Sequence, residues 1–153
     1  THIDTHMGSV VHPKFLASYL NLAKEFEVPA FLPRITRERL INLGEGAMSE
    51  AFLEAIERVE AETVPTLDEI LIETLVPLTD KHEFYRQMIK SVRPGLTHLL
   101  FHPAVNGPEL AAIADTHASR HADFEAFKTR DLANFAEEQG IHLIGYRALK
   151  AHL

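Results

Sequence analysis

The sequence predicts an α/β fold in which parallel β-strands alternate with helices. Two observations lead to this prediction. Short apolar runs bounded by Pro or Gly recur along the chain, and segments with apolar side chains at spacings of three and four lie between them. This alternation favours a parallel sheet, because parallel strands are joined by crossover helices. The predicted order is β-α-β-α-(β)-α-β-α-β, in a single domain that covers residues 1–153.

The predicted strands are short, and the first one is polar on one face. Residues 1–6 alternate polar and apolar side chains, as the end of a half-buried strand does. The apolar runs predict further strands at residues 28–32, 96–104 and 141–146. Residues 63–75 fit either a strand followed by a loop or a loop followed by a helix.

The predicted helices have recognisable ends. Pro13 suits the first turn of a helix that ends near Glu27. Thr36 can cap a second helix, which Gly44 and Gly46 weaken before its apolar stripe resumes at residues 48–59. The remaining helices are expected from Asp80 to the Pro94-Gly95 pair, over residues 109–114, and over residues 119–139 before Gly140.

The composition excludes several classes of function. The net charge is −7, and the 15 Lys and Arg residues are scattered, so we expect no nucleic-acid partner. The chain has no cysteine, which excludes disulfides, thiolate metal sites and a cysteine nucleophile and fits a cytoplasmic location. No apolar run is long enough to form a transmembrane helix, so we expect no membrane partner.

The opening stretch THIDTHMG places His2, Asp4 and His6 at every second position. Side chains two residues apart on a strand are separated by about 7 Å, whereas a divalent metal needs ligands at about 2.0–2.3 Å. Three residues of one flat strand therefore cannot all bind one ion. His6 is the best placed, because active sites of parallel α/β folds lie at the C-terminal ends of strands. A polar edge strand with incidental histidines explains the same spacing.

A second candidate is His102, which ends an apolar run and precedes Pro103. This position predicts that His102 lies at the same rim as His6, although a core histidine bonded to a backbone carbonyl also explains it. His98 lies four residues earlier and is expected to be structural. His117 and His121 have a spacing that can chelate a metal on a helix, but the acidic residue of a metalloprotease motif is missing.

Three stretches together resemble the YdjC-like family of carbohydrate deacetylases, which includes chitooligosaccharide deacetylases. They are THIDTHMG, VRPGLTHLLFHPA and GIHLIGYRAL, in that order. The corresponding family patterns are T-H-x-D-[ST]-H, P-G-x-[TE]-x-x-x-H-P and G-[IY]-x-L-x-[GS]-Y-R. Each pattern is weak alone, whereas the ordered set is fairly specific and spans the whole chain.

The resemblance implies a deformed, polysaccharide-deacetylase-like (β/α) barrel that uses a divalent metal, Mg²⁺ or Zn²⁺, to remove acetyl groups from N-acetylated sugars or oligosaccharides. His6 falls on a metal ligand of the family, and Asp4 falls on an Asp that supports this ligand. His102 falls on the general acid for the leaving amine. Arg34 matches a position that is often basic, and Tyr146 is a candidate aromatic contact for the sugar.

Two departures from the family pattern limit what this chain is expected to do. The family continues with further histidines where this chain has Met7, Gly8 and Ser9. The family's N-terminal half, with an Asp-Asp pair and another metal histidine, has no counterpart in residues 1–153. We therefore expect the chain to be the C-terminal part of a larger barrel, inactive by itself, and to form homo-oligomers through its unpaired strand edges.

Two other functions remain open on the residues alone. One is a non-catalytic α/β interaction or regulatory domain, in which the histidines are solvated or structural. The other is an unrelated small metallohydrolase that uses His6, His102 and a carboxylate such as Asp68 or Asp115.

Overall fold

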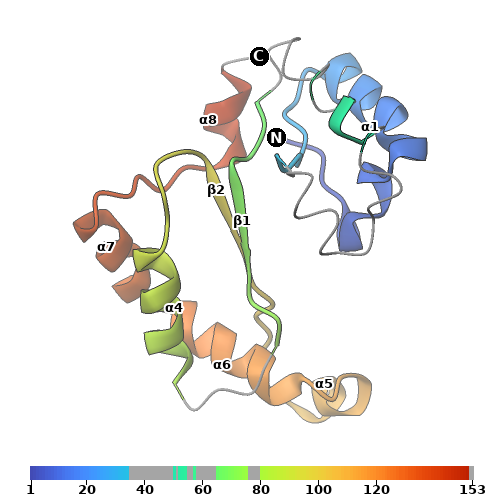
Figure 1. Cartoon of the computed structure of the whole chain (residues 1–153). Helices are drawn as coiled ribbons and strands as arrows, with labels where there is room; N and C mark the ends of the chain where they lie inside the picture. The colour runs from blue at the N-terminus through green and yellow to red at the C-terminus, as the bar shows by residue number, and fades with distance from the viewer. Residues whose placement is uncertain (35–49, 51, 55–56, 58–64, 76–79, 152–153) are drawn as a thin grey trace. The chain divides into compact units, whose positions relative to one another are not determined.

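The structure is a computed structural model that describes residues 1–34, 50, 52–54, 57, 65–75 and 80–151. The chain divides into two compact units (Figure 1). Unit 1 contains residues 1–69 and 144–153, and unit 2 contains residues 70–143. Most of the helix predicted to follow Thr36 falls outside the described residues, and the expectation of a single domain stays a prediction.

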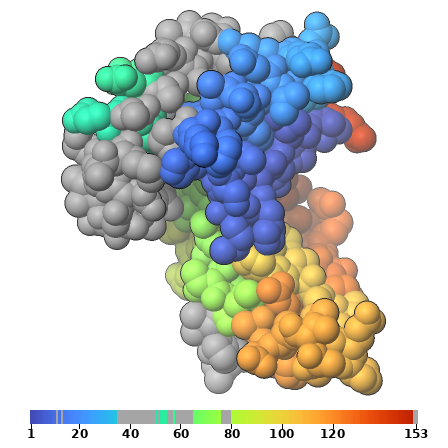
Figure 2. Space-filling model, turned by 90° about the vertical axis from the view of Figure 1, so that its right-hand side faces the viewer, coloured from blue at the N-terminus to red at the C-terminus, as the bar shows by residue number. Residues whose placement is uncertain are grey.

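Unit 1 is built around helix α1 (Pro13–Glu25), which begins with the proline that predicted it. A 3₁₀ segment, η1 (His6–Val11), precedes α1, and the two form one continuous surface that is blue in Figure 2. The short helix α8 (Tyr146–Lys150) belongs to the same unit. The core of unit 1 combines the apolar stripe of α1 with buried residues from later in the chain. Its members are Leu16, Tyr19, Leu20, Ala23, Ala30, Leu32 and Phe52.

The strands predicted at residues 1–6 and 28–32 are wrong in extent, because among the described residues they share one isolated parallel bridge, between Ile3 and Ala30. A second isolated parallel bridge joins Pro33, directly after the second predicted strand, to Leu67. The backbone is still extended at Thr5, with φ of −134° and ψ of 123°, and η1 begins at His6; left-handed Met7 and Gly8, with φ of 57° and 69°, follow within η1. An alternating pattern indicates an extended backbone, but it does not reveal how many of its residues are hydrogen-bonded to an adjacent strand.

Unit 2 contains a parallel strand–helix–strand element, except for Glu69, the first residue of its first strand, which is counted with unit 1. Strand β1 (Glu69–Ile72) is followed by helix α4 (Lys81–Lys90) and then by strand β2 (Thr97–Leu100), which is hydrogen-bonded to β1. The ambiguous stretch 63–75 thus contains a strand. Helix α4 starts where the sequence predicts, because Asp80 caps it by accepting the backbone N–H of Glu83 at 2.9 Å.

The helix predicted over residues 119–139 is two helices, α6 (His117–Phe127) and α7 (Asp131–Glu138). The helical conformation is interrupted between them, where the backbone N–H of Asp131 donates a hydrogen bond to the hydroxyl of Thr129. A shorter helix, α5 (Pro108–Ile113), comes before them. Helices α4, α6 and α7 share a core in unit 2, formed by Tyr85, Ile89, Ala126, Leu132, Phe135 and Ala136.

The strand predicted at residues 141–146 is wrong. Gly140 has a φ of 79° and follows α7 as predicted, but residues 141–145 have no regular structure and Tyr146 begins α8. Ile141 packs against the core of unit 2, whereas Leu143 and Ile144 are 57% and 55% exposed, so only the start of the apolar run is partly buried in the described chain. None of the described helices has the length and apolar character needed to cross a membrane.

Candidate functional site

Five polar residues of unit 2 converge beyond the carboxyl ends of its two strands. Glu73 directly follows β1, and His102 lies two residues beyond β2. Lys81 and Tyr85 come from α4, and Asp123 comes from α6. We call these five residues the polar cluster. All of them except the half-buried His102 are at most 5% exposed, so the cluster is an interior feature rather than a solvated surface.

Local structure explains why these side chains meet. The carboxyl ends of neighbouring parallel strands lie at the same edge, which brings the residues after β1 and β2 together. Lys81 and Tyr85 are four residues apart and therefore share one face of α4. The Asp80 cap fixes the first turn of this helix, which holds Lys81 at its start.

Asp123 is the centre of the hydrogen bonding. Its Oδ1 is 3.1 Å from Lys81 Nζ and accepts the Tyr85 hydroxyl at 2.8 Å. Its Oδ2 accepts the backbone N–H of His102 at 3.1 Å. An ionised carboxylate accepts hydrogen bonds and donates none, so it suits a position that is surrounded by donors.

Lys81 is the cation of the cluster. Its ammonium forms ion pairs with Glu73 and with Asp123, so one positive charge serves two buried carboxylates. Within the described chain, three buried polar atoms have no hydrogen-bond partner: Glu73 Oε2, His102 Nδ1 and Lys81 Nζ, whose contacts with the two carboxylates are ion pairs. Such atoms are costly to bury, and in a native structure they often mark a functional site.

Aromatic rings enclose the hydroxyl of Tyr85. The ring centroid of Tyr85 lies 5.4 Å from that of Phe84, 6.1 Å from that of Phe101 and 4.6 Å from that of Phe127. Burial raises the pKa of Tyr85, and its hydrogen bond to the Asp123 carboxylate raises it further. The hydroxyl therefore stays protonated and acts as a fixed donor to Asp123.

Glu73, His102 and Asp123 could hold a metal ion. Each offers one donor atom, and the three atoms lie within 4.8 Å of one another. Carboxylate oxygens and an imidazole nitrogen are common ligands of divalent metals, so the types of donor fit. Lys81 contacts both carboxylates, however, and a bound ion would compete with its ammonium for the same oxygens.

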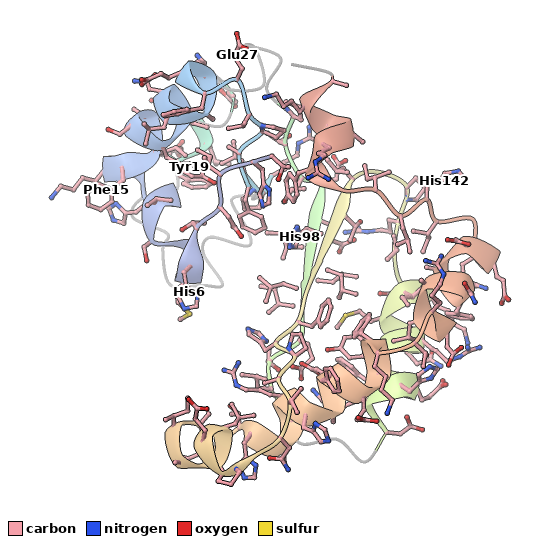
Figure 3. All side chains as sticks on the ribbon, turned by 180° about the vertical axis from the view of Figure 1, so that it is seen from behind. His6, Phe15, Tyr19, Glu27, His98 and His142 are labelled. Atoms are coloured by element: carbon pink, nitrogen blue, oxygen red, sulfur yellow. The ribbon has the colours of Figure 1, made fainter. Side chains whose placement is uncertain are left out.

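His6 lies in unit 1, at the start of η1, where its side chain is exposed (Figure 3). The next residue, Met7, is 87% exposed. Asp4, the expected support of His6, accepts the backbone N–H of its neighbour Thr5 at 2.6 Å. The metal-binding role of His6 and the supporting role of Asp4 stay predictions.

The two predicted sugar-binding residues have defined neighbours in unit 1. The guanidinium of Arg34 lies 2.7 Å from the carboxylate of Asp68 in an exposed ion pair. Tyr146 stacks on His2, with ring centroids 3.9 Å apart and planes inclined by 9°. Burial and the charge of Asp4 raise the pKa of Tyr146 to about 12. Tyr146 also lines an open cavity of about 390 Å³.

The remaining candidates from the sequence have structural partners or lie at the surface. His117 Nδ1 is 3.3 Å from the side-chain oxygen of Asn106, and His121 Nδ1 accepts the backbone N–H of Asn106 at 3.3 Å. This histidine pair therefore holds the loop before α5. His98 is part of β2, and Asp115 is exposed.

Four members of the polar cluster were missed by the sequence analysis: Glu73, Lys81, Tyr85 and Asp123. Two signals could have found the carboxylates. Glu73 directly follows the apolar run ILI at the end of a strand, just as His102 directly follows the apolar run LLF. Asp123 lies on the same buried face of α6 as Ser119 and Ala126, where an unpaired charge is costly and a buried partner is expected.

The fold and the cluster define a mixed α/β protein with a histidine and two carboxylates beyond its parallel strands. The YdjC-like protein family model matches residues 1–138. The chain therefore belongs to the YdjC-like family, as its three sequence motifs predicted.

Two curated relatives are named carbohydrate deacetylases. The chain is 24% identical to the protein from Thermoanaerobacter pseudethanolicus over 150 residues, which cover 98% of this chain and 52% of the relative. It is 29% identical to the protein from Thermus thermophilus over 153 residues, which cover 100% of this chain and 54% of the relative. The chain thus spans about half the length of the curated relatives it matches.

A solved structure supports the fold. The crystal structure of a candidate cellobiose-phosphate cleavage protein from Enterococcus faecalis superposes with a TM-score of 0.68 and 22% sequence identity. The match covers 97% of this chain and 52% of that protein. At this identity the likeness shows the shared fold alone.

Proposed function

We propose that the chain supplies part of a metal-dependent carbohydrate deacetylase, a hydrolase that removes acetyl groups from N-acetylated sugars or oligosaccharides. Membership of the YdjC-like family and two relatives named carbohydrate deacetylases support this activity. Coverage of about half of each relative supports the idea that the catalytic protein is a deformed (β/α) barrel larger than this chain. The absence of cysteine fits a cytoplasmic location.

The observation that carries the proposal is the position of His102. Its imidazole follows a parallel strand, its Nδ1 has no hydrogen-bond partner in the described chain, and its backbone is held by Asp123. Cleavage of an amide requires a proton for the leaving nitrogen as the C–N bond breaks, and a positioned histidine can donate it. We assign this general-acid role to His102.

The other predicted residues have roles that fit their surroundings. A divalent ion bound by His6, with Mg²⁺ and Zn²⁺ as the candidates, would polarise the acetyl carbonyl and lower the pKa of a bound water. Asp4 would support His6. Tyr146 presents a half-buried aromatic ring next to a cavity, where a sugar could stack, and Arg34 presents a cation that could hydrogen-bond sugar hydroxyls.

A histidine substitution in the natural protein that contains this chain tests the proposal. His102→Gln should lower the rate of acetate release from diacetylchitobiose, measured with added Mg²⁺ or Zn²⁺, by about 10²–10⁴-fold, because the proton donor is lost. The matched control is His142→Gln, since His142 is exposed and should tolerate the change. Equal activity of the two variants would show that His102 is not the general acid.

The 153-residue chain alone should release no acetate. A single imidazole ligand such as His6 does not retain a divalent ion at useful concentrations, because catalytic sites use about three protein ligands. The same assay on the purified chain measures this directly. Clear turnover by the chain would mean that residues 1–153 contain the complete catalytic site.

A further inference from the structure

We propose, on the basis of the function proposed above, that Asp123 is the positioning residue of His102. It would act by holding the backbone that carries the imidazole, rather than by contacting substrate. The observation behind this proposal is that one buried carboxylate joins the turn after β2 to helices α4 and α6.

The turn after β2 is attached to α6 at two points. The backbone N–H of His102 donates to Asp123 Oδ2 at 3.1 Å, and the backbone N–H of Ala104 donates to the carbonyl of Arg120 at 3.0 Å. Pro103 lies between them and has no N–H to donate. Both N–H groups that flank the proline are therefore bonded to the same helix, which restricts the direction of the His102 side chain.

Asp123 cannot turn away from His102 without breaking other contacts. Its Oδ1 is held by Lys81 Nζ at 3.1 Å and by the Tyr85 hydroxyl at 2.8 Å, so its Oδ2 is directed to the turn. The carboxyl group is fully buried, and both of its oxygens face groups that can only donate: an ammonium and a backbone N–H. An asparagine could satisfy only one of them, because its amide nitrogen would face the other donor.

Removal of Asp123 leaves the rest of the cluster charge-balanced. Lys81 keeps its ion pair with Glu73, so Asp123→Ala leaves one ammonium with one carboxylate. Glu73→Ala is the matched control, because it also removes one carboxylate from Lys81 but keeps the bond between Asp123 and His102. These two variants separate the loss of buried charge from the loss of the contact to the turn.

Amide hydrogen exchange tests the contact without reference to activity. In the natural protein, measured by NMR, Asp123→Ala should raise the exchange rate of the His102 N–H by about tenfold or more. The amides of β2 should keep their protection, and Glu73→Ala should leave the His102 N–H protected. An unchanged His102 exchange rate in Asp123→Ala would overturn the proposal. If Asp123→Ala does not fold, Asp123→Leu, which has a similar size and also lacks an acceptor for the His102 N–H, is judged by the same criterion.

Steady-state kinetics test the consequence for catalysis. Asp123→Ala should lower kcat for acetate release from diacetylchitobiose by about 100-fold with little change in KM, because a proton donor displaced by about 1 Å loses its reactive geometry. Asp131→Ala, at the exposed start of α7, is the control. A change in KM alone would overturn the positioning role. No acetate release by the unaltered protein would refute the proposed function, whereas the exchange result would still decide whether Asp123 holds His102.

Discussion

The two histidines that the sequence singled out have contrasting surroundings. His102 follows a hydrogen-bonded strand in unit 2, is half-buried, and has its backbone fixed by a fully buried carboxylate. His6 is exposed in unit 1, begins a 3₁₀ segment and is followed by a left-handed Met7. Among the described residues, none hydrogen-bonds the His6 ring. Unit 2 therefore orients its histidine with its own buried charges, and the described part of unit 1 shows no equivalent support for His6.

The same contrast appears in the buried tyrosines of the two units. The hydroxyl of Tyr19, which is labelled in Figure 3, shares its single proton between two backbone carbonyls, those of Ile3 at 3.0 Å and Phe31 at 3.2 Å. The hydroxyl of Tyr85 donates to the carboxylate of Asp123. Unit 1 thus ties its extended segments together with neutral hydrogen bonds, whereas unit 2 relies on a charged network.

The largest expected effect on stability is that of Lys81→Met. Without the ammonium, Glu73 and Asp123 are left as buried, unpaired carboxylates. We expect a loss of about 3–5 kcal/mol in the free energy of unfolding, measured by urea denaturation. Lys128→Met is the control, because Lys128 pairs with Glu125 at the surface and such pairs contribute about 0–1 kcal/mol. Similar losses in both variants would mean that the polar cluster is not a buried ionic network.

A smaller effect is expected from removing a single hydroxyl. Tyr85→Phe should destabilise the protein by about 1.5–3 kcal/mol, because it removes a hydrogen bond to a charged acceptor. Tyr19→Phe should cost about 0.5–1.5 kcal/mol, because its acceptors are neutral carbonyls. Urea denaturation of both variants measures the difference, and a larger loss for Tyr19→Phe would reverse the contrast between the two units.

Alkaline titration should detect the burial of all three tyrosines. Burial disfavours the charged phenolate, so the pKa of each is raised, that of Tyr146 to about 12. The stabilisation linked to these shifts is complete below pH about 10, the ordinary pKa, and for Tyr146 it is lost as the pH rises through about 12. Tyrosinate absorbance of the native protein at pH 10 should stay well below half of the total, whereas the urea-unfolded protein should be half ionised. Half ionisation of the native protein at pH 10 would contradict the burial.

The smallest effect is expected from Arg34→Ala. Arg34 and Asp68 form an ion pair whose side chains are 51% and 39% exposed, so water screens their attraction. The free energy of unfolding should change by less than about 1 kcal/mol, measured by urea denaturation at low and high salt. A loss of unfolding free energy as large as that of Lys81→Met would mean that unit 1 also depends on a strongly stabilising ion pair.

The sequence predicted the elements that depend on local rules. Pro13, Asp80 and Gly140 mark helix ends as expected, since caps and left-handed backbones need particular residue types. It failed for residues 1–6, where alternation predicted a strand, and for residues 141–146, where an apolar run did, because a strand also needs a partner from elsewhere in the chain. The sequence identified His102 but missed Asp123, because a contact between residues 21 positions apart has no local pattern.

The most direct test of a shared catalytic site is a crystal structure of the natural protein with a non-hydrolysable analogue of diacetylchitobiose. A ring nitrogen of His102 should lie about 2.6–3.2 Å from the atom that replaces the amide nitrogen of the sugar. The imidazole of His6 should bind a metal ion next to the acetyl group. Rings of His6 and His102 on opposite sides of the molecule, too far apart for one sugar to reach both, would contradict the account.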